Sequence, residues 1–218
     1  MVWTVLNQRL SRNDYEVVTI ESGNLPFPNL LAEVLGRMDR KSPIDLRNEK
    51  FPLLLRFRKL LQEQVLSTGR HFVLVIDEAQ EMDPGDLVEL KNLTNMGTEE
   101  STLLTILLIG QPELRAKVKA LPQLDQRISL RFHLNPLGRG DIPSYLGHRL
   151  KVAGHPTGEV FSPACSELVF RATGGIPRKI NRICKLSLDM AYSLSSPEVD
   201  EGIVTTIVRD LYRQEGIL

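Results

Sequence analysis

Two short runs of consecutive apolar residues constrain the fold of this chain more than any other feature of its sequence. Residues 72–76 read FVLVI and residues 102–109 read TLLTILLI. Short apolar runs of this kind are typical of strands that are buried on both faces of a parallel sheet. A segment with helical spacing follows each run, so strands and helices alternate along the chain. Repeated strand–helix units predict an α/β fold with right-handed crossover connections.

The spacing of apolar residues elsewhere in the chain predicts the other strands and helices and indicates two domains. Residues 15–20 (YEVVTI) are rich in β-branched side chains and predict a strand, and the more polar residues 129–134 predict a last one. Apolar side chains at helical spacing predict helices at 2–10, 28–36, 51–68, 84–95, 113–120, 141–153, 163–173, 177–194 and 199–213. The polar residues 37–50 predict a loop. We therefore expect an α/β domain over residues 1–137 and an all-α domain over residues 138–218.

Charge and cysteine content narrow the possible partners and compartments. Lys and Arg together number 27, as do Asp and Glu, so no overall field draws the chain toward nucleic acid or anionic lipid. Cys165 and Cys184 lie far apart on the apolar sides of predicted helices, which indicates buried thiols in a reducing cytosol. No apolar run approaches the ~20 residues of a membrane span. We expect a soluble, cytoplasmic protein whose attachment to an inner membrane, if any, is made by parts beyond these residues.

The segment FVLVIDEAQ, residues 72–80, carries the strongest chemical signal. Asp77 and Glu78 follow directly after the apolar run, and open parallel sheets bind ligands at the carboxyl ends of their strands. Phosphoryl transfer needs one carboxylate near Mg²⁺ and another group that orients the attacking water. Adjacent acids can divide these roles because successive side chains point in different directions. The alternative is that both acids merely open a polar loop after a core strand.

Four segments, in this order, resemble the motifs of one ATPase family. VLVIDEAQ resembles a Walker B segment, ILLIGQPEL (106–114) a sensor-1 strand and its helix, LDQRISLRFHLNPL (124–137) an arginine-bearing segment, and GGIPRKINRIC (174–184) a sensor-2 motif. Over nearly its whole length the chain is similar to the AAA+ ATPases, and more closely to the general secretion pathway protein A family. The resemblance implies the parallel sheet of a P-loop NTPase followed by an all-α lid, with ATP and Mg²⁺ as cofactors.

The resemblance implies roles for three residues near the strand ends. Asp77 corresponds to the residue that binds the Mg²⁺ shell, and Glu78 to the residue that activates water. Gln111, just past the sensor-1 strand, corresponds to a residue that bridges this water and the γ-phosphate. Many AAA+ proteins place Asn, Ser or Thr at that point, and the alternative for Gln111 is a turn residue before Pro112.

Two arginine positions are also implied as nucleotide contacts. Arg127 corresponds to an arginine finger that reaches the nucleotide of a neighbouring subunit, with Arg131 as the competing candidate. Arg178 corresponds to the sensor-2 contact and falls in the first turn of a predicted helix, where a cation is unfavourable unless an anion is its partner. The alternative is a solvated basic face, because Arg178 shares one side of its helix with Arg182 and Lys185.

No phosphate-binding loop is present in the printed residues. A P-loop needs G-x-x-x-x-G-K followed by Ser or Thr, and no Gly-Lys pair occurs in the chain. In the resembled family this loop and its strand precede a helix like VWTVLNQRL. The resemblance therefore implies that Met1 falls just after the loop, as a true start or a truncation, and that the sheet lacks its first, central strand. Such a fragment is expected to be marginally stable and to bind ATP weakly or not at all by itself.

The resemblance implies an ATPase module whose nucleotide-driven assembly serves a secretion or pilus-type apparatus in the bacterial envelope. The expected partners are further copies of the chain, or an intact AAA+ paralogue docked on the Arg127 face, together with secretion-apparatus proteins. One alternative is a DNA-associated AAA+ ATPase of the transposition or initiator-loader type, for which the basic stripe around Arg178 is the only support. The other is a non-catalytic relic that acts as an interaction module.

Overall fold

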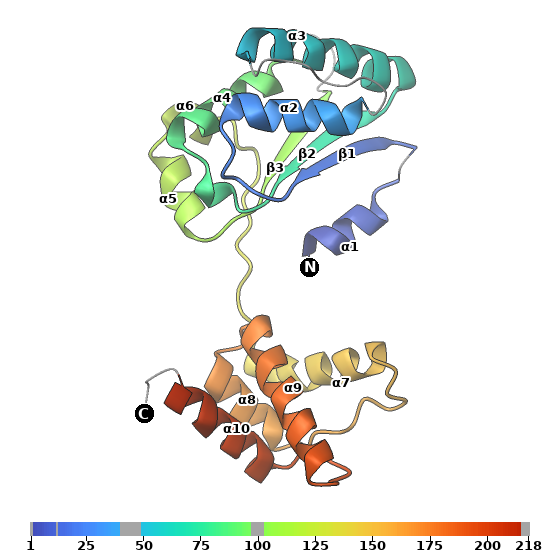
Figure 1. Ribbon diagram of the computed structural model, residues 1–218, viewed down its shortest axis with the longest axis vertical. Helices are drawn as coiled ribbons and strands as arrows, with labels where there is room; N and C mark the ends of the chain where they lie inside the picture. Colours follow the sequence, from blue (N-terminus) through green and yellow to red (C-terminus); the bar gives the residue numbers. More distant parts are fainter. Residues whose placement is uncertain (1, 12, 40–48, 97–102, 215–218) are drawn as a thin grey trace. The chain divides into compact units, whose positions relative to one another are not determined.

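The chain folds as two compact units, each described here by itself (Figure 1). They comprise Met1–Arg131 and Phe132–Leu218, and the predicted boundary at 137/138 lies a few residues after this division. The first unit contains a parallel sheet with helices, which confirms the predicted α/β class. The computed structural model describes residues 2–11, 13–39, 49–96 and 103–214.

The sheet of the first unit has the order β1-β2-β3, with both pairs of neighbours parallel. Its strands are β1 (Tyr15–Ile20), β2 (His71–Ile76) and β3 (Leu104–Leu108). The register pairs Ile20 with Ile76 and Ile76 with Leu108. All three strands therefore end at the same edge of the sheet, which is where a ligand site is expected.

The helices agree with the sequence-based expectations to within a few residues. They are α1 (Val2–Arg9), α2 (Phe27–Met38), α3 (Lys50–Leu60), α4 (Pro84–Thr94), α5 (Glu113–Lys119), α6 (Pro122–Asp125), α7 (Ile142–Val152), α8 (Cys165–Thr173), α9 (Pro177–Ser193) and α10 (Glu201–Gln214). The short α6 was not predicted. Within the described ranges, no helix combines the length and the apolar character that crossing a membrane requires.

Two further helix predictions need comment. The helix predicted over 51–68 is confirmed as one continuous helical segment, but α3 passes into a π-helical turn, Leu61–Val65, and then a 3-10 turn, Leu66–Thr68. Phe57, Leu61 and Val65 of the predicted apolar face are fully buried, so the pattern was preserved while the hydrogen bonding changed. Of the loop predicted over 37–50, residues 40–48 lie outside the described residues.

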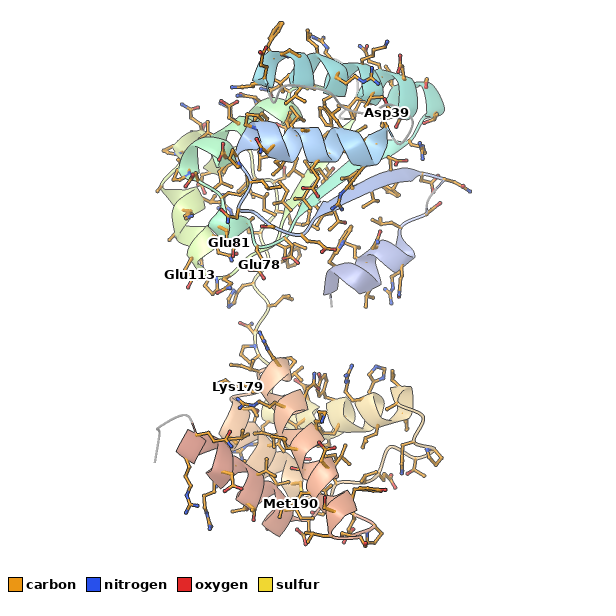
Figure 2. The ribbon with its side chains drawn as sticks, in the orientation of Figure 1. Asp39, Glu78, Glu81, Glu113, Lys179 and Met190 are labelled. Carbon is orange, nitrogen blue, oxygen red and sulfur yellow. The ribbon has the colours of Figure 1, made fainter. Side chains whose placement is uncertain are left out.

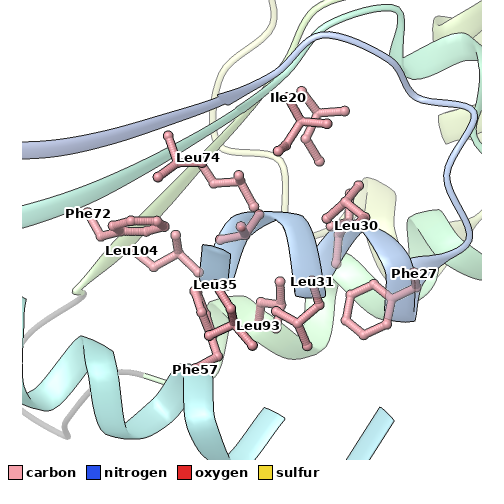
Figure 3. Packing of buried hydrophobic residues seen from close by; sticks show 14 of the residues in the cluster. Ile20, Phe27, Leu30, Leu31, Leu35, Phe57, Phe72, Leu74, Leu93 and Leu104 are labelled. Carbon is pink, nitrogen blue, oxygen red and sulfur yellow. The ribbon is translucent and has the colours of Figure 1, made fainter. Parts of the chain in front are cut away.

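One hydrophobic core holds the sheet against α2, α3 and α4 (Figure 3). Its large, fully buried side chains include Ile20, Phe27, Leu30, Leu31, Leu35, Phe57, Phe72 and Leu74. The rings of Phe57 and Phe72 meet edge to face with centroids 5.8 Å apart. Such a pair adds about 0.5–1.5 kcal/mol to the stabilisation from burial. Figure 1 shows α2 and α3 on the same side of the sheet. Packing against these helices fixes each strand along its own direction, and with it the position of the strand end.

Two strand predictions need correction. Residues 129–134 form no strand, because they have no ladder partner among the described residues, and Leu130, Phe132 and Leu134 are exposed. β3 was predicted to be buried on both faces, but only Leu104 is fully buried and Thr105 is exposed. Within the described part of the chain β3 is hydrogen-bonded on one side only, to β2, and this edge position explains its exposure. β2 itself is buried at all positions after His71, as predicted.

The second unit is built around a separate helical core. Ile142, Val169 and Ile180 are fully buried within it. Cys165 and Cys184 are free and buried, as predicted, and burial raises the pKa of the Cys184 thiol to about 12.

A pair of glycines joins α8 to α9 and supports the chain that enters this unit. Gly174 and Gly175 have φ of 59° and 76°, in the left-handed region that favours glycine. The Leu137 N–H donates a hydrogen bond to the Gly175 carbonyl at 2.9 Å. A Cβ on Gly175 would lie 2.0 Å from the Leu137 carbonyl oxygen, so only glycine fits there.

Replacing each glycine separately tests this close approach. Gly175→Ala is expected to destabilise the helical unit by more than about 2 kcal/mol, because it adds a steric clash to the left-handed backbone cost. Gly174→Ala is the matched control, since its Cβ would meet nothing within 4 Å, and it is expected to cost only about 1 kcal/mol. Urea denaturation followed by circular dichroism measures both values. Equal loss of stability in the two variants would contradict the steric explanation.

Candidate functional site

The loop that follows β2 is held to both neighbouring strands by backbone hydrogen bonds. The Asp77 N–H donates to the Ile20 carbonyl and the Ala79 N–H donates to the Ile109 carbonyl, each at 2.9 Å. The sheet ladder therefore continues past the strand ends on both sides of the loop. This places Asp77 and Glu78 at the carboxyl end of β2, the location that their sequence positions predicted (Figure 2).

Asp77 has a half-buried carboxylate with one oxygen already engaged. Its Oδ1 accepts the Glu78 N–H at 2.9 Å, and Oδ2 has no hydrogen-bond partner among the described residues. Mg²⁺ in phosphate-handling sites is commonly bound through one or two carboxylates, several waters and the phosphates themselves. The described residues contain no group of three or more metal-ligating side chains. Asp77 therefore fits a Mg²⁺ ion that takes its other ligands from water and phosphate.

Glu78 has an unusual backbone conformation for a side chain of its type. Its φ of 51° and ψ of 36° lie in the left-handed region, at a cost of about 1–2 kcal/mol for a non-glycine residue. The Glu81 N–H donates to the Glu78 carbonyl at 2.9 Å, which stabilises the turn. Gly23, in the loop after β1, leaves room for that same carbonyl, because a Cβ there would lie 2.5 Å from it. The loops after β1 and β2 thus fit together at Glu78.

Gln80 connects Glu78 to the end of β3, and sequence reasoning missed this residue. Its Nε2 donates to Glu78 Oε2 at 2.7 Å, and its Oε1 accepts the Gln111 N–H at 3.0 Å. This contact of Gln111 is made by its backbone N–H, and the role expected for its side chain stays a prediction. The available signal was the position of Gln80 two residues after Glu78, which places it on the same loop.

α5 fastens this loop from the other side. The Lys117 Nζ donates to the carbonyls of Gln80 and Met82 at 2.5 and 2.9 Å. A half-buried ammonium group that binds two carbonyls of one turn restricts the movement of that turn. Glu81 and Glu113 lie at the same end of the sheet as Glu78 in Figure 2, but both are exposed.

The two arginine-finger candidates differ in what they contact. Arg131 forms an ion pair with Asp125 Oδ1 at 2.7 Å and also donates to the Asp125 carbonyl. Arg127, two residues after the end of α6, is exposed, and its guanidinium has no hydrogen bond or ion pair within the described residues. Arg127 is therefore the candidate whose guanidinium is available to a partner.

Arg178 belongs to the helical unit and was predicted to meet the same nucleotide. It is exposed in the first turn of α9, directly after Pro177 at the helix start. This confirms the predicted local placement. Its convergence with Asp77 and Glu78 concerns two separately described units and stays a prediction.

Residues 4–118, more than half of the chain, match the family described as AAA domain. The chain belongs to this family. The chain is 40% identical over 155 residues to general secretion pathway protein A of Aeromonas hydrophila, across 69% of this chain and 28% of the relative.

Solved structures show the same fold. The Aeropyrum pernix ORC2 protein, described as ADPNP-ADP complexes, has a TM-score of 0.63 at 17% identity, across 95% of this chain and 54% of that one. Cdc6p from Pyrobaculum aerophilum has a TM-score of 0.65 at 15% identity, across 91% and 52%. The chain thus spans about a quarter of the Aeromonas relative and about half of each solved chain. These likenesses confirm the predicted P-loop NTPase type of sheet.

Substitution of Gly23 tests the fit between the two loops of this AAA domain. Gly23→Ala is expected to destabilise the α/β unit by about 1–3 kcal/mol, because its Cβ meets backbone that must move. Gly85→Ala in the first turn of α4 is the control, since its Cβ meets nothing within 4 Å, and it is expected to be neutral or stabilising by up to about 1 kcal/mol. Urea denaturation measures both. An unchanged midpoint for Gly23→Ala would show that the loops are not closely fitted.

Proposed function

We propose that this AAA domain is an ATPase module with its reaction centre at the carboxyl ends of β1, β2 and β3. The observation that carries the proposal is the Glu78 carboxylate. It stands at the strand end in a left-handed backbone conformation, with Oε2 bound by Gln80. A costly conformation that is held by several contacts is a feature of functional sites.

Asp77 and Glu78 divide the chemistry of this centre. Asp77 Oδ2 is the oxygen proposed to face Mg²⁺, which when bound offsets the negative charge of the phosphate oxygens. Glu78 Oε1 is proposed to accept a proton from the attacking water, whose oxygen forms a bond to the γ-phosphorus. The bond from this phosphorus to the leaving oxygen breaks, and the products are ADP and phosphate. The printed residues contain no phosphate-binding loop, so none of them is proposed to wrap the phosphates.

Arg127 is proposed to act on the nucleotide of a neighbouring subunit. A guanidinium stays charged and suits bidentate contact with phosphate oxygens. Arg127 is exposed and has no guanidinium partner in the part of the chain that the structure describes, which supports this role over Arg131, held by Asp125. Arg178 is proposed as a further nucleotide contact from the helical unit. The process served is proposed to be assembly of a secretion or pilus-type envelope apparatus, because the Aeromonas relative is named for general secretion.

The DNA-associated alternative depends on the basic stripe of α9. Arg178, Arg182 and Lys185 are all exposed on this helix. However, Lys185 Nζ pairs with Asp189 at 2.8 Å one turn further on, which offsets part of the charge that a nucleic acid would meet. With a net charge of zero for the chain, ATP-driven assembly remains the better-supported function.

Replacing Glu78 tests the catalytic assignment. The assay protein is the complete translation product of the reading frame that contains these residues. Glu78→Gln is expected to lower kcat for ATP hydrolysis about 10²–10⁴-fold, because the amide cannot accept the proton. Nucleotide affinity is expected to change by less than about twofold, since the contact matters only during reaction.

The exposed Glu81 supplies the matched control. Glu81→Gln removes one carboxylate three residues away and is expected to leave kcat within about twofold of the unsubstituted protein. Full activity of Glu78→Gln would refute the role of Glu78. Absence of Mg²⁺-dependent hydrolysis in the unsubstituted protein would instead favour the non-catalytic interaction module.

Mixing two inactive variants tests whether Arg127 acts between subunits. Arg127→Ala is expected to lower kcat at least about 10²-fold, whereas Arg131→Ala removes only the contacts of Arg131 with Asp125. An equal mixture of Arg127→Ala and Glu78→Gln subunits is expected to recover about a quarter of full activity, because some intact Glu78 sites then adjoin an intact Arg127. A mixture without any recovery would contradict action in trans.

A further inference from the structure

We propose that Gln80 is a positioning residue that couples the Glu78 carboxylate to the β3–α5 loop. Its catalytic meaning rests on the proposed ATPase function, while the coupling itself is a property of the structure. One amide side chain contacts both elements: Nε2 donates to Glu78 Oε2 at 2.7 Å and Oε1 accepts the Gln111 N–H at 3.0 Å.

The two partners determine the orientation of this amide. A carboxylate accepts only and a backbone N–H donates only, so the Gln80 amide satisfies both in a single orientation. Turning it over would bring an oxygen against the carboxylate and an NH₂ group against the N–H. Neither Glu nor an apolar residue at this position can make both contacts.

Neighbouring residues hold both the backbone and the side chain of Gln80 in place. Lys117 Nζ holds the Gln80 carbonyl at 2.5 Å, and the Ala79 N–H ties the preceding residue to Ile109. A Cβ on Gly110 would lie 2.7 Å from Gln80 Oε1, so the glycine lets the amide approach the loop. Side chain and backbone are therefore fixed between β2 and β3.

This arrangement gives the β3–α5 loop an influence on Glu78. When the Gln111 backbone shifts, for example as a ligand binds beside it, the Gln80 amide must follow or lose a hydrogen bond. Either response changes the position of Glu78 Oε2. The geometry thus assigns to Gln80 the transmission of loop movement to the proposed base.

Hydrogen exchange of the Gln111 amide tests the coupling without any need for catalysis. Gln80→Met has a similar length but no polar atom, and it is expected to speed exchange of this amide about three- to tenfold. Gln80→Glu keeps an acceptor for the Gln111 N–H but loses the contact with Glu78, so it is expected to speed exchange as well, though less than Gln80→Met. Glu78→Ala removes only the far partner, yet it is expected to speed Gln111 exchange, because Gln80 loses its anchor.

Two outcomes of the hydrogen-exchange measurement would overturn the coupling between Glu78 and Gln111. The Ile109 amide, which donates to the Ile76 carbonyl, serves as the reference and is expected to exchange at an unchanged rate in all variants. Unchanged Gln111 exchange in Glu78→Ala would overturn the coupling, whatever the ATPase activity of the protein. Faster exchange of Gln111 and Ile109 together would overturn it as well, because it would indicate general loosening of the loop.

Steady-state kinetics on the complete translation product test the positioning role. Gln80→Met and Gln80→Glu are each expected to lower kcat at least about tenfold with KM for ATP within about twofold, since both lose the donor to Glu78. Gln123→Met is the control, because it removes a side-chain hydrogen bond to Lys91 outside the β2 loop. Normal kcat in both Gln80 variants would overturn the positioning role. A protein that hydrolyses no ATP would overturn the proposed function, and the exchange results would still decide the coupling.

Discussion

The hydrogen-bond ladder between three parallel strands is the constraint on which the rest of the α/β unit depends. It brings the ends of β1, β2 and β3 to one edge, and it continues into the loop through Asp77 and Ala79. The apolar core under α2 and α3 keeps the strands in register. Because the loop backbone is fixed in this way, the loops after all three strands meet near Glu78. Gly23 lies against the Glu78 carbonyl, and Gln80 links the Glu78 carboxylate to the Gln111 N–H.

The site contains both hydrogen-bonded groups and carboxylate oxygens that have no partner among the described residues. Asp77 Oδ2 and Glu78 Oε1 have no hydrogen-bond partner among the described residues, while Asp77 Oδ1, Glu78 Oε2 and the Gln80 carbonyl each accept a hydrogen bond. Catalytic groups gain from such pre-organisation, because little reorientation is needed at the moment of reaction. The AAA domain thus concentrates its rigidity in the loop backbone and leaves two oxygens available.

Local sequence patterns predicted most of the secondary structure and the location of the acids, because strand and helix periodicity are properties of neighbouring residues. They failed where a partner distant in sequence decides the outcome. The pattern at 129–134 suits a strand, but no ladder partner exists for it among the described residues. The contacts of Gly23 and Gln80 were not predicted, since they depend on how two loops meet in space. Gln80 was visible in the sequence, but its two partners were not.

The buried thiols of the helical unit have a practical consequence. Cys165 and Cys184 are the only cysteines of the chain, and burial raises the pKa of both, that of Cys184 to about 12. At neutral pH both side chains are therefore held as the thiol, while the thiolate is the form that reacts with maleimides. A cysteine introduced on the surface will therefore be labelled selectively. The natural sequence is in this sense already a background for site-directed fluorescent probes.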